Sequence, residues 1–342
     1  MGRYFFCYYI PGGYTSIKTV EFRYLSQKDV IDVGLTMKNA ISIVEEVLNE
    51  HGLKEFENPP KPGIHTLQGA FIHAMPGFLP RKKAAGMKWV SGYSDNFQYG
   101  LPSIMGLVVL NDPNTGQPLA VMDGGYITAL RTAAASGVSA KYLAAKDAGV
   151  IGIVGTGVQG RYHLLSLKEV LPRIEEIKIF DTNESVLADF ISHAKAHGSL
   201  NIISCTSAQE VIEGADVVVT ATGHLEERVY KDGWVKKGAL VLPVHTRGWE
   251  KSMLDKADKF IVDDWQQFNN ALGGSDGYYA PLPQLYAELG QIVVGKKPGR
   301  ENTVERIVNL NFGMAIHDVL MATHILEQAE AKGIGMMLPL LE

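Results

Sequence analysis

The chain has 342 residues, of which 46% are hydrophobic and 20% are charged, and its formal net charge is −5. That length is typical of two domains of about 150 residues each, and the apolar fraction can form a large buried core. The composition excludes disordered, collagen-like and coiled-coil chains. Because the small net charge is negative, we expect no nucleic-acid partner and no membrane partner.

The two cysteines, Cys7 and Cys205, lie far apart and outside any CxxC or Cys/His cluster. This pattern predicts neither a disulfide scaffold nor a metal site, and it favours the reducing cytoplasm. The apolar run at residues 5–10 is too short for the core of a signal peptide. No segment has the roughly 18 uninterrupted apolar residues that a membrane-spanning helix needs. We therefore expect a cytoplasmic protein without a catalytic metal.

The first third of the chain predicts a mostly antiparallel sheet with a flanking helix. The helix is expected at residues 27–52, with Ser26 as its N-cap and Gly52 beyond its end. The NDPNTG sequence at 111–116 predicts a tight turn between two strands. The expected strands are residues 70–74, 86–91, 104–110 and 118–122.

From about residue 127 the chain alternates helices and strands, which is typical of a parallel sheet covered on both faces. The expected helices are residues 128–145, 159–170, 184–197 and 207–214. The expected strands are residues 148–154, 176–180, 201–204, 216–220 and 239–244. A last helix is predicted at 309–332, with Gly333 as its stop.

A glycine-rich turn follows the predicted strand at 148–154 and opens the next predicted helix. Its sequence, GTGVQG at 155–160, has the GxGxxG spacing of dinucleotide-binding turns. Gly155 permits the tight turn, Gly157 lets the backbone approach a pyrophosphate, and Gly160 lets helix and strand pack closely. The helix N-terminus would hold the phosphates, so we predict a dinucleotide site. The alternative is a turn that binds another nucleotide or none.

Asp181 follows the next predicted strand, at 176–180. An acidic side chain at this place accepts hydrogen bonds from the ribose hydroxyls and repels a 2′-phosphate. Thr182 and Asn183 follow, and no Arg stands there to hold such a phosphate. The sequence therefore predicts NAD rather than NADP as the cofactor, with Asp181 and Thr182 at the ribose.

Five segments of the chain together resemble the ornithine cyclodeaminase/μ-crystallin family. They are GMKWVSGYSDN at 86–96, MDGGYITALRTAA at 122–134, GIVGTGVQG at 152–160, GADVVVTATG at 214–223 and NFGMAIHDV at 311–319. The resemblance extends over nearly the whole chain, from about Tyr24 onward. It implies an oxidoreductase or lyase that acts on amino or imino acids with a nicotinamide cofactor.

The resemblance also implies the domain organisation, which agrees with the alternation of elements. A Rossmann-type domain with a parallel sheet is expected at residues 129–306. A second, α+β domain is expected to combine residues 1–128 with 307–342, to bind the substrate and to form a homodimer. The fold class is therefore α/β.

Residue by residue, the resemblance assigns Lys88 and Arg131 to the substrate carboxylate. Arg is a planar fork suited to a carboxylate, and Lys is a compact charge that can also move a proton. Arg131 lies in the first turn of the predicted helix 128–145, where the helix dipole disfavours a cation, and this favours a ligand role. The remaining expected cofactor contacts are Thr132, Val158, Gln159, Ala221, Thr222, Val244 and Asn311.

Three positions depart from the cyclodeaminase pattern. Arg247 stands where the resemblance places an Asp used in ring closure, and an Arg cannot act as a carboxylate base. His73 replaces an acidic residue that handles the amino end of ornithine, and Lys61 replaces a carboxylate-binding Arg. The candidate cations Lys61, Lys88, Arg131 and Arg247 would suit a substrate with more than one carboxylate.

The sequence therefore favours an NAD-dependent oxidoreductase that acts on the C–N bond of an amino or imino acid. Such an enzyme would be an amino acid dehydrogenase, a ketimine reductase or an opine-type dehydrogenase. Lys88, His73 and His245 are the candidate acid/base residues, since His titrates near neutrality. Two alternatives stay open. One is a cyclodeaminase, which converts ornithine to proline and ammonia without net change of the cofactor. The other is a non-enzymatic binding protein.

Overall fold

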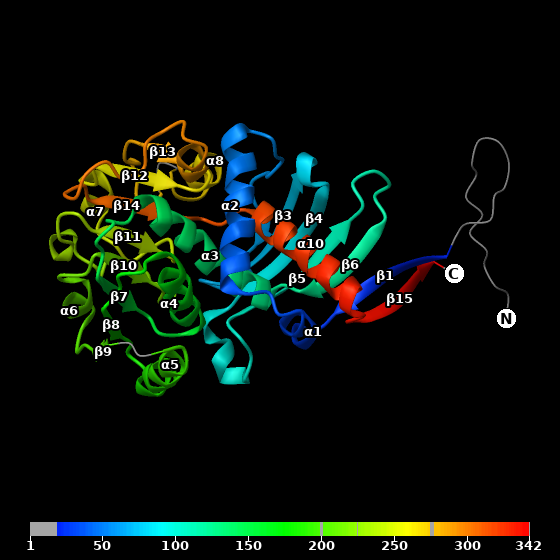
Figure 1. The fold of residues 1–342 in the computed structure, drawn as a ribbon, viewed down its shortest axis with the longest axis horizontal. Helices are drawn as coiled ribbons and strands as arrows, with labels where there is room; N and C mark the ends of the chain where they lie inside the picture. Colours follow the sequence, from blue (N-terminus) through cyan, green and yellow to red (C-terminus); the bar gives the residue numbers. More distant parts are fainter. Residues whose placement is uncertain (1–18, 199–200, 224, 274–276, 342) are drawn as a thin grey trace.

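The computed structural model describes residues 19–198, 201–223, 225–273 and 277–341, which form two β-sheets with helices around them (Figure 1). The smaller sheet has the strand order β15-β1-β6-β5-β4-β3-β2 in the described residues. Its strands are β1 (Val20–Leu25), β2 (Gly63–Ile64), β3 (Phe71–Leu79), β4 (Ala84–Gly92), β5 (Ile104–Asn111), β6 (Pro118–Asp123) and β15 (Met336–Leu341). Strands β3 to β6 pair antiparallel, as the sequence predicts. Strand β2, which the sequence did not predict, pairs antiparallel with β3, and β1 joins β6 in parallel.

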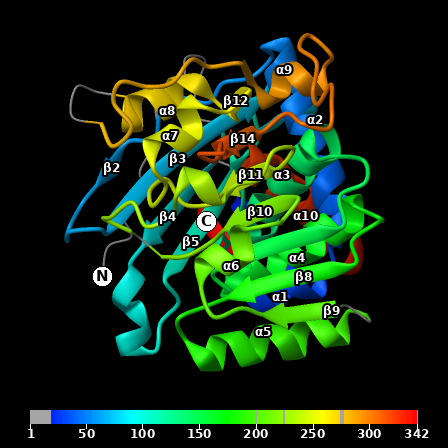
Figure 2. The ribbon, with the colours of Figure 1, turned by 90° about the vertical axis from the view of Figure 1, so that its left-hand side faces the viewer.

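The larger sheet is parallel throughout its described strands, with the order β13-β12-β14-β11-β10-β7-β8-β9. Figure 2 shows β8, β10 and β11 running in the same direction. The strands are β7 (Val150–Val154), β8 (Glu176–Phe180), β9 (Asn201–Ser204), β10 (Val217–Thr220), β11 (Leu240–Pro243), β12 (Lys259–Val262), β13 (Ala287–Glu288) and β14 (Ile307–Leu310). The helices that accompany them are α4 (Val158–Val170), α5 (Glu184–Ala196), α6 (Ala208–Ile212), α7 (Lys251–Asp255), α8 (Trp265–Leu272) and α9 (Leu289–Val293).

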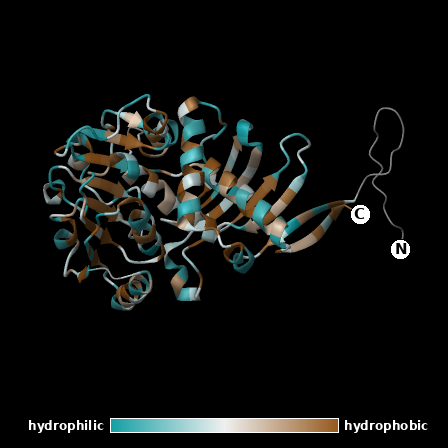
Figure 3. Cartoon of the chain, in the orientation of Figure 1, coloured by the Kyte–Doolittle hydropathy of each residue, from teal (hydrophilic) through white to brown (hydrophobic). Residues whose placement is uncertain are grey.

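Three long helices connect the two sheets. Helix α2 (Met37–Leu53) and α3 (Gly125–Leu143) lie between them, and α10 (Ala315–Lys332) runs along one face of the smaller sheet (Figure 1). Small residues in α3 allow its close approach to α4, because a Cβ added at Gly137 would lie 2.3 Å from Ser166 Oγ. One buried apolar cluster includes Met122 of the smaller sheet and Ile151 of the larger, so the two sheets share a core. In Figure 3, strands of both sheets carry brown, hydrophobic segments.

The structure corrects three sequence expectations about elements. The helix predicted at 27–52 is two helices, α1 (Gln27–Asp32) and α2, because Thr36 caps a new helix after a turn. The tail predicted as helix from 309 begins as strand β14, and α10 starts only at Ala315; its end at Gly333 is confirmed. Residues 307–310, assigned to the substrate domain, pair with β11 and β12 of the larger sheet, and the boundary expected at 128/129 falls inside α3.

Short 3-10 helices complete the described elements: η1 (Pro80–Lys82), η2 (Ser94–Tyr99) and η3 (Asp232–Trp234). The predicted turn at 111–116 joins β5 to β6, and the Asp112 carboxylate accepts hydrogen bonds from the backbone amides of Asn114 and Thr115. Within the described residues, no helix is long and apolar enough to span a membrane.

Candidate functional site

The predicted cofactor residues follow the carboxyl ends of neighbouring parallel strands. Gly155 comes after β7, Asp181 after β8, Ala221 after β10, Val244 after β11 and Asn311 after β14. Because all these strands are parallel, their carboxyl ends meet at one edge of the larger sheet. Open parallel sheets bind their ligands at this edge.

The three glycines of the turn differ in what surrounds them: Gly155 and Gly160 are packed against protein backbone, whereas Gly157 borders open space. Gly155 has φ +92°, and a Cβ there would lie 2.6 Å from the Ala221 backbone. A Cβ at Gly160 would lie 2.3 Å from the Gly155 carbonyl oxygen, whereas one at Gly157 would meet nothing within 4 Å. Gly157 is also the N-cap of α4, so the open space lies at a helix N-terminus. This space and the free amides there fit a pyrophosphate.

The other predicted nucleotide contacts border the same turn. Gln159, in the first turn of α4, has a buried Oε1 without a hydrogen-bond partner in the described residues, and Val158 is 54% exposed. Asp181 Oδ2 accepts hydrogen bonds from Thr156 N at 2.7 Å and Thr156 Oγ1 at 3.0 Å. These bonds hold the carboxylate at the end of β8, directly before Thr182. Its place fits the ribose contact predicted from the sequence.

A buried cation pair lies on the smaller sheet and its helices. Lys88 Nζ, from β4, donates to Asp318 Oδ1 of α10 at 2.7 Å, and Arg131 Nε, from α3, donates to the same oxygen at 3.2 Å. Lys88 also donates to Thr128 Oγ1 at 3.2 Å. Lys88 is 1% exposed and Asp318 is fully buried. Burial and the Arg131 charge lower the pKa of Lys88 to about 8, against the opposing effect of Asp318.

Lys61 approaches the same group from the segment before β2. Its Nζ donates to the Phe312 carbonyl at 2.7 Å and lies 3.9 Å from the centroid of the Phe312 ring. The Asp263 carboxylate, after β12, accepts from the backbone amides of Phe312 and Gly313 and so fixes this loop. Burial lowers the pKa of Lys61 to about 7, with further lowering by the charges of Arg131 and Lys88. Two lysines thus titrate close to neutrality beside one arginine.

A small cavity lies between Arg131 of this cation group and the carboxyl edge of the larger sheet. Its lining includes Arg131, Thr132, Val244, Asp263, Asn311 and His317. The Thr132 hydroxyl and both ring nitrogens of His317 are buried without hydrogen-bond partners in the described residues. Asn311 Nδ2 donates to Ser139 Oγ at 3.2 Å. The cavity thus joins one predicted carboxylate binder to three predicted cofactor contacts.

The candidate acid/base histidines occupy different surroundings. His73 stacks on Phe71 with ring centroids 4.4 Å apart, and burial together with the charges of Lys61, His65 and Lys88 lowers its pKa to about 4. His73 is therefore close to the cations but neutral at pH 7. His245 lies on the loop after β11, with its ring centroid 5.8 Å from that of Tyr230. It is not among the residues that line the cavity.

Arg247 is separate from the other three candidate cations. Its Nη1 lies 3.6 Å from Glu226 Oε2, and its guanidinium carbon lies 5.1 Å from the centroid of the Tyr278 ring. Neither of these contacts involves Asp318 or the Phe312 loop. The structure therefore brings Lys61, Lys88 and Arg131 together and holds Arg247 elsewhere. Thr222, another predicted cofactor contact, lies with its Oγ1 3.3 Å from Tyr230 OH.

Two features of the site differ from the sequence reasoning. Helix α3 begins at Gly125, so Arg131 and Thr132 lie beyond its first turn, and the argument from the helix N-terminus was wrong. Asp318 and Asp263, which hold the cation group together, received no role from the sequence. A signal existed for Asp318, since it is an acidic residue among Ile316, Val319 and other apolar residues of a predicted helix.

Among the described residues, no group of three or more His, Cys, Asp or Glu side chains could hold a metal ion. The fold and the site instead define a dinucleotide-binding protein whose second domain presents buried cations. The profile of the ornithine cyclodeaminase/mu-crystallin family matches residues 23–333, and the chain belongs to this family. The resemblance stated from the sequence and the α/β fold class are thereby confirmed.

Similar proteins extend over nearly the full chain. The nodulation efficiency protein NfeD of Rhizobium meliloti is 43% identical over 315 residues, which cover 92% of this chain and 97% of that protein. The structure of Thermococcus litoralis Δ1-pyrroline-2-carboxylate reductase in complex with NADH and L-proline has a TM-score of 0.85 and 34% identity, covering 92% and 99% of the two chains. An archaeal alanine dehydrogenase dimer with bound NAD has a TM-score of 0.83 and 33% identity, covering 94% and 100%. The expected activity class and cofactor agree with these two solved structures.

Proposed function

We propose that this chain is an NAD-dependent oxidoreductase that interconverts the amine and imine forms of an amino acid. The observation that carries the proposal is the buried pair of Lys88 and Arg131 on Asp318, beside a cavity that also receives Val244 and Asn311. Cations at this place bind a carboxylate and hold the α-carbon at the carboxyl edge of the nucleotide-binding sheet. Similarity to a pyrroline-2-carboxylate reductase and an alanine dehydrogenase supports the same reading.

The residues present fit the cofactor. The open space at Gly157 and the N-terminus of α4 suit the pyrophosphate, and the Asp181 carboxylate suits the ribose. Val244 and Asn311 reach the cavity where a nicotinamide ring would lie. When bound, the nicotinamide accepts or supplies the hydride.

The chain's own residues supply binding and proton transfer. Arg131 and Lys88 clamp the substrate carboxylate. In the oxidative direction the α-carbon loses a hydride and the nitrogen loses a proton, and reduction reverses both. Lys88 can hold or move that proton, because its pKa of about 8 lies near neutrality. His73 with a pKa of about 4 serves as a neutral hydrogen-bonding group rather than as an acid.

The function is tested by recording NADH absorbance and ammonia release together on the purified protein. NAD is offered with L-proline, L-alanine, L-aspartate and L-ornithine, and NADH with the matching imino or keto acids and ammonia. Net NADH change with one of these substrates supports the proposal. Ammonia from ornithine without net NADH change would replace it by a cyclodeaminase, and cofactor binding without turnover of any substrate would favour a binding protein.

The sequence-based expectation of a substrate with a second carboxylate depends on Arg247 contacting that substrate. In the structure Arg247 pairs with Glu226 and faces Tyr278. The charges of Lys61, Lys88 and Arg131 are partly balanced by two buried carboxylates, Asp318 and Asp263. This balance favours one substrate carboxylate, and preference for L-aspartate over L-alanine in the panel would contradict it.

The protein also forms a homodimer through the outer face of the smaller sheet. Exposed Trp89 and Leu107 are direct cross-strand partners there, and so are exposed Tyr24 and Met336. Helix α10 covers the opposite face of the same sheet, where it packs against residues such as Gly77 of β3. A broad apolar face of this kind is typical of an interface. A second copy is the proposed occupant, and similarity to the dimeric alanine dehydrogenase supports it.

Sedimentation of the full chain tests the dimer. Leu107→Asp should convert it to a monomer, because a carboxylate would be buried at the interface. Val304→Asp is the matched control, since Val304 is exposed on the loop before β14. A monomeric wild type, or a dimer that tolerates Leu107→Asp, would contradict the proposal. We also retain the cytoplasm as the location; Cys205, a free buried thiol, suits a reducing compartment.

A further inference from the structure

Asp318 is the point at which three elements of the substrate site meet. Its Oδ1 receives Lys88 Nζ from β4 and Arg131 Nε from α3, while Asp318 itself lies in the first turns of α10. The carboxylate is fully buried, and Oδ2 has no hydrogen-bond partner in the described residues. Asp318 neutralises one of two adjacent positive charges, so the pair keeps a net positive charge for a ligand.

The way in which Asp318 engages Arg131 favours a role in substrate binding. The hydrogen bond uses Nε, which leaves the terminal nitrogens Nη1 and Nη2 for a bidentate contact with a carboxylate. Gly313 lies beside those nitrogens: a Cβ built there would be 2.9 Å from Nη1. The backbone at Gly313 has φ +89°, a conformation that favours glycine. Glycine at this position thus lets the backbone lie close against the end of the guanidinium that Asp318 does not contact.

We propose, on the basis of the function proposed above, that Asp318 is the positioning residue of the substrate site, which orients Arg131 for a bidentate carboxylate contact and holds the Lys88 ammonium group beside it. Asp318 acts through these two cations. Its removal should therefore change substrate binding and the protonation of Lys88, while the nucleotide site is preserved.

The expected pH effect follows from the charges around Lys88. Burial and Arg131 disfavour its charged form, whereas Asp318 is the group that favours it. Without the Asp318 charge, Lys88 should lose its proton at lower pH. The titratable and charged groups that face Lys88 and Asp318 come from α3, α10, β3 and the segment before β2: Arg131, His317, His73 and Lys61.

The test compares Asp318→Asn with wild type in the reductive reaction, from pH 6 to pH 10. Asn keeps the size of the side chain and one acceptor but removes the charge. We expect kcat/KM at pH 8 to fall about 100-fold, in line with the loss of a charge-assisted contact and of a correctly protonated group. The alkaline limb of the kcat/KM profile should shift to lower pH by about one unit. NADH affinity, read by fluorescence, should change less than about threefold.

Asp232→Asn is the matched control. Asp232 is also buried and ion-paired, with Lys256 and Arg306, but it lies on η3, away from the cavity. Both variants should lose thermal stability, and only Asp318→Asn should move the pH profile. An Asp318→Asn protein that binds NADH and keeps the wild-type profile and KM would overturn the proposal.

A turnover-independent readout separates this proposal from the proposed function. Pyruvate in the presence of NADH should raise the Tm of wild type and of Asp232→Asn, and should raise that of Asp318→Asn much less. If wild type reduces none of the imino acids yet is stabilised by pyruvate in an Asp318-dependent way, the proposed activity fails and the positioning role stands. Equal stabilisation of all three proteins contradicts the positioning role.

Discussion

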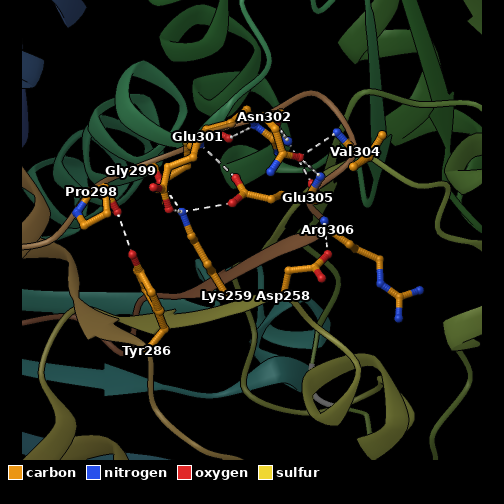
Figure 4. Close-up of polar contacts among 12 residues, drawn as sticks. Asp258, Lys259, Tyr286, Pro298, Gly299, Glu301, Asn302, Val304, Glu305 and Arg306 are labelled. Atoms are coloured by element: carbon orange, nitrogen blue, oxygen red, sulfur yellow. Dashed lines mark hydrogen bonds and ion pairs between the residues drawn. The ribbon is translucent and has the colours of Figure 1, made fainter.

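Two buried lysines of this molecule have opposite electrostatic surroundings. Lys88, in the proposed substrate site, reaches one carboxylate oxygen that it shares with Arg131. Lys259, on β12, donates to Glu301 at 2.7 Å and to the Gly299 carbonyl at 2.5 Å, and lies 3.1 Å from Glu305 (Figure 4). Their side chains are 1% and 5% exposed. The two lysines are thus similarly buried, but Lys88 shares a single carboxylate with Arg131, whereas Lys259 pairs with two carboxylates.

The pKa values follow this difference. Burial lowers the pKa of Lys88 to about 8, while for Lys259 the hydrogen bonds with Glu301 and Glu305 outweigh burial and raise the pKa. The folded state holds the Lys259 proton more tightly than the unfolded chain, so Lys259 stabilises the fold at neutral pH and loses this effect as pH rises through its folded pKa. Lys88 has the opposite sign: the free energy of unfolding rises with pH from about 8 toward the ordinary value of 10.5. Burying the Lys88 charge therefore costs stability, and the positive charge that Asp318 does not neutralise is available to a ligand.

The largest expected effect comes from removing each lysine in turn. Lys88→Met should lower kcat/KM about 10³-fold, because it removes a carboxylate contact and a proton carrier together. Lys259→Met should leave kcat/KM within about threefold but lower the free energy of unfolding by about 3 kcal/mol, since Glu305 stays buried without its partner. Steady-state kinetics and urea unfolding on both proteins provide the measurement.

The opposite result for Lys88→Met would contradict this comparison of the two lysines. An active Lys88→Met protein with reduced stability would make Lys88 a structural residue like Lys259. NADH affinity within about threefold of wild type in both variants controls for the integrity of the nucleotide site.

The same contrast exists within the glycine turn. Gly157→Ala places a Cβ in open space at the N-terminus of α4, so NADH affinity should fall about tenfold while the Tm stays near that of wild type. Gly160→Ala places a Cβ 2.3 Å from the Gly155 carbonyl oxygen, and overpacking should destabilise the fold by about 2 kcal/mol. Fluorescence titration and thermal unfolding separate the two effects. An equal loss of Tm in both variants would mean that Gly157, like Gly160, is needed for packing and not for the cofactor.

These two halves of the site differ in how far the sequence predicts them. The nucleotide half depends on consecutive residues: an apolar strand, the turn from Gly155 to Gly160, a helix, and Asp181 after the next strand. Local periodicity and spacing are sufficient to place all of these at one sheet edge. The strands β12 and β14 were missed because each has only four residues, three of them apolar, and so short a run does not distinguish a strand from a helix start.

The substrate half depends on contacts between distant segments. Asp318 is 230 residues from Lys88 and 187 from Arg131 in the chain, so no local pattern couples them. Lys88 and Arg131 were found through the family resemblance, and the carboxylate that holds them was not. Arg247 carries the same charge as Arg131, and only the structure shows that Glu226 and Tyr278 engage it.

Titration sharpens the comparison without any mutation. If protonated Lys88 binds the substrate carboxylate, kcat/KM should fall as pH rises through about 8, approaching tenfold per unit above it. The profile of Lys259→Met should follow that of wild type, because Lys259 stays protonated across this range. A flat profile from pH 7 to pH 10 would contradict the role of the Lys88 charge.

Arg247 should produce the smallest effect. Arg247→Met removes an ion pair with Glu226 whose side chains are 37% and 61% exposed, and exposed pairs contribute little to stability. Because Arg247 pairs with Glu226 rather than with Asp318, KM for the preferred monocarboxylic substrate should change less than about twofold. The measurement is KM for a monocarboxylic and a dicarboxylic imino acid on the same preparation. A rise in KM that is confined to the dicarboxylic substrate would instead place Arg247 with Lys61, Lys88 and Arg131 as a fourth cation that contacts the ligand.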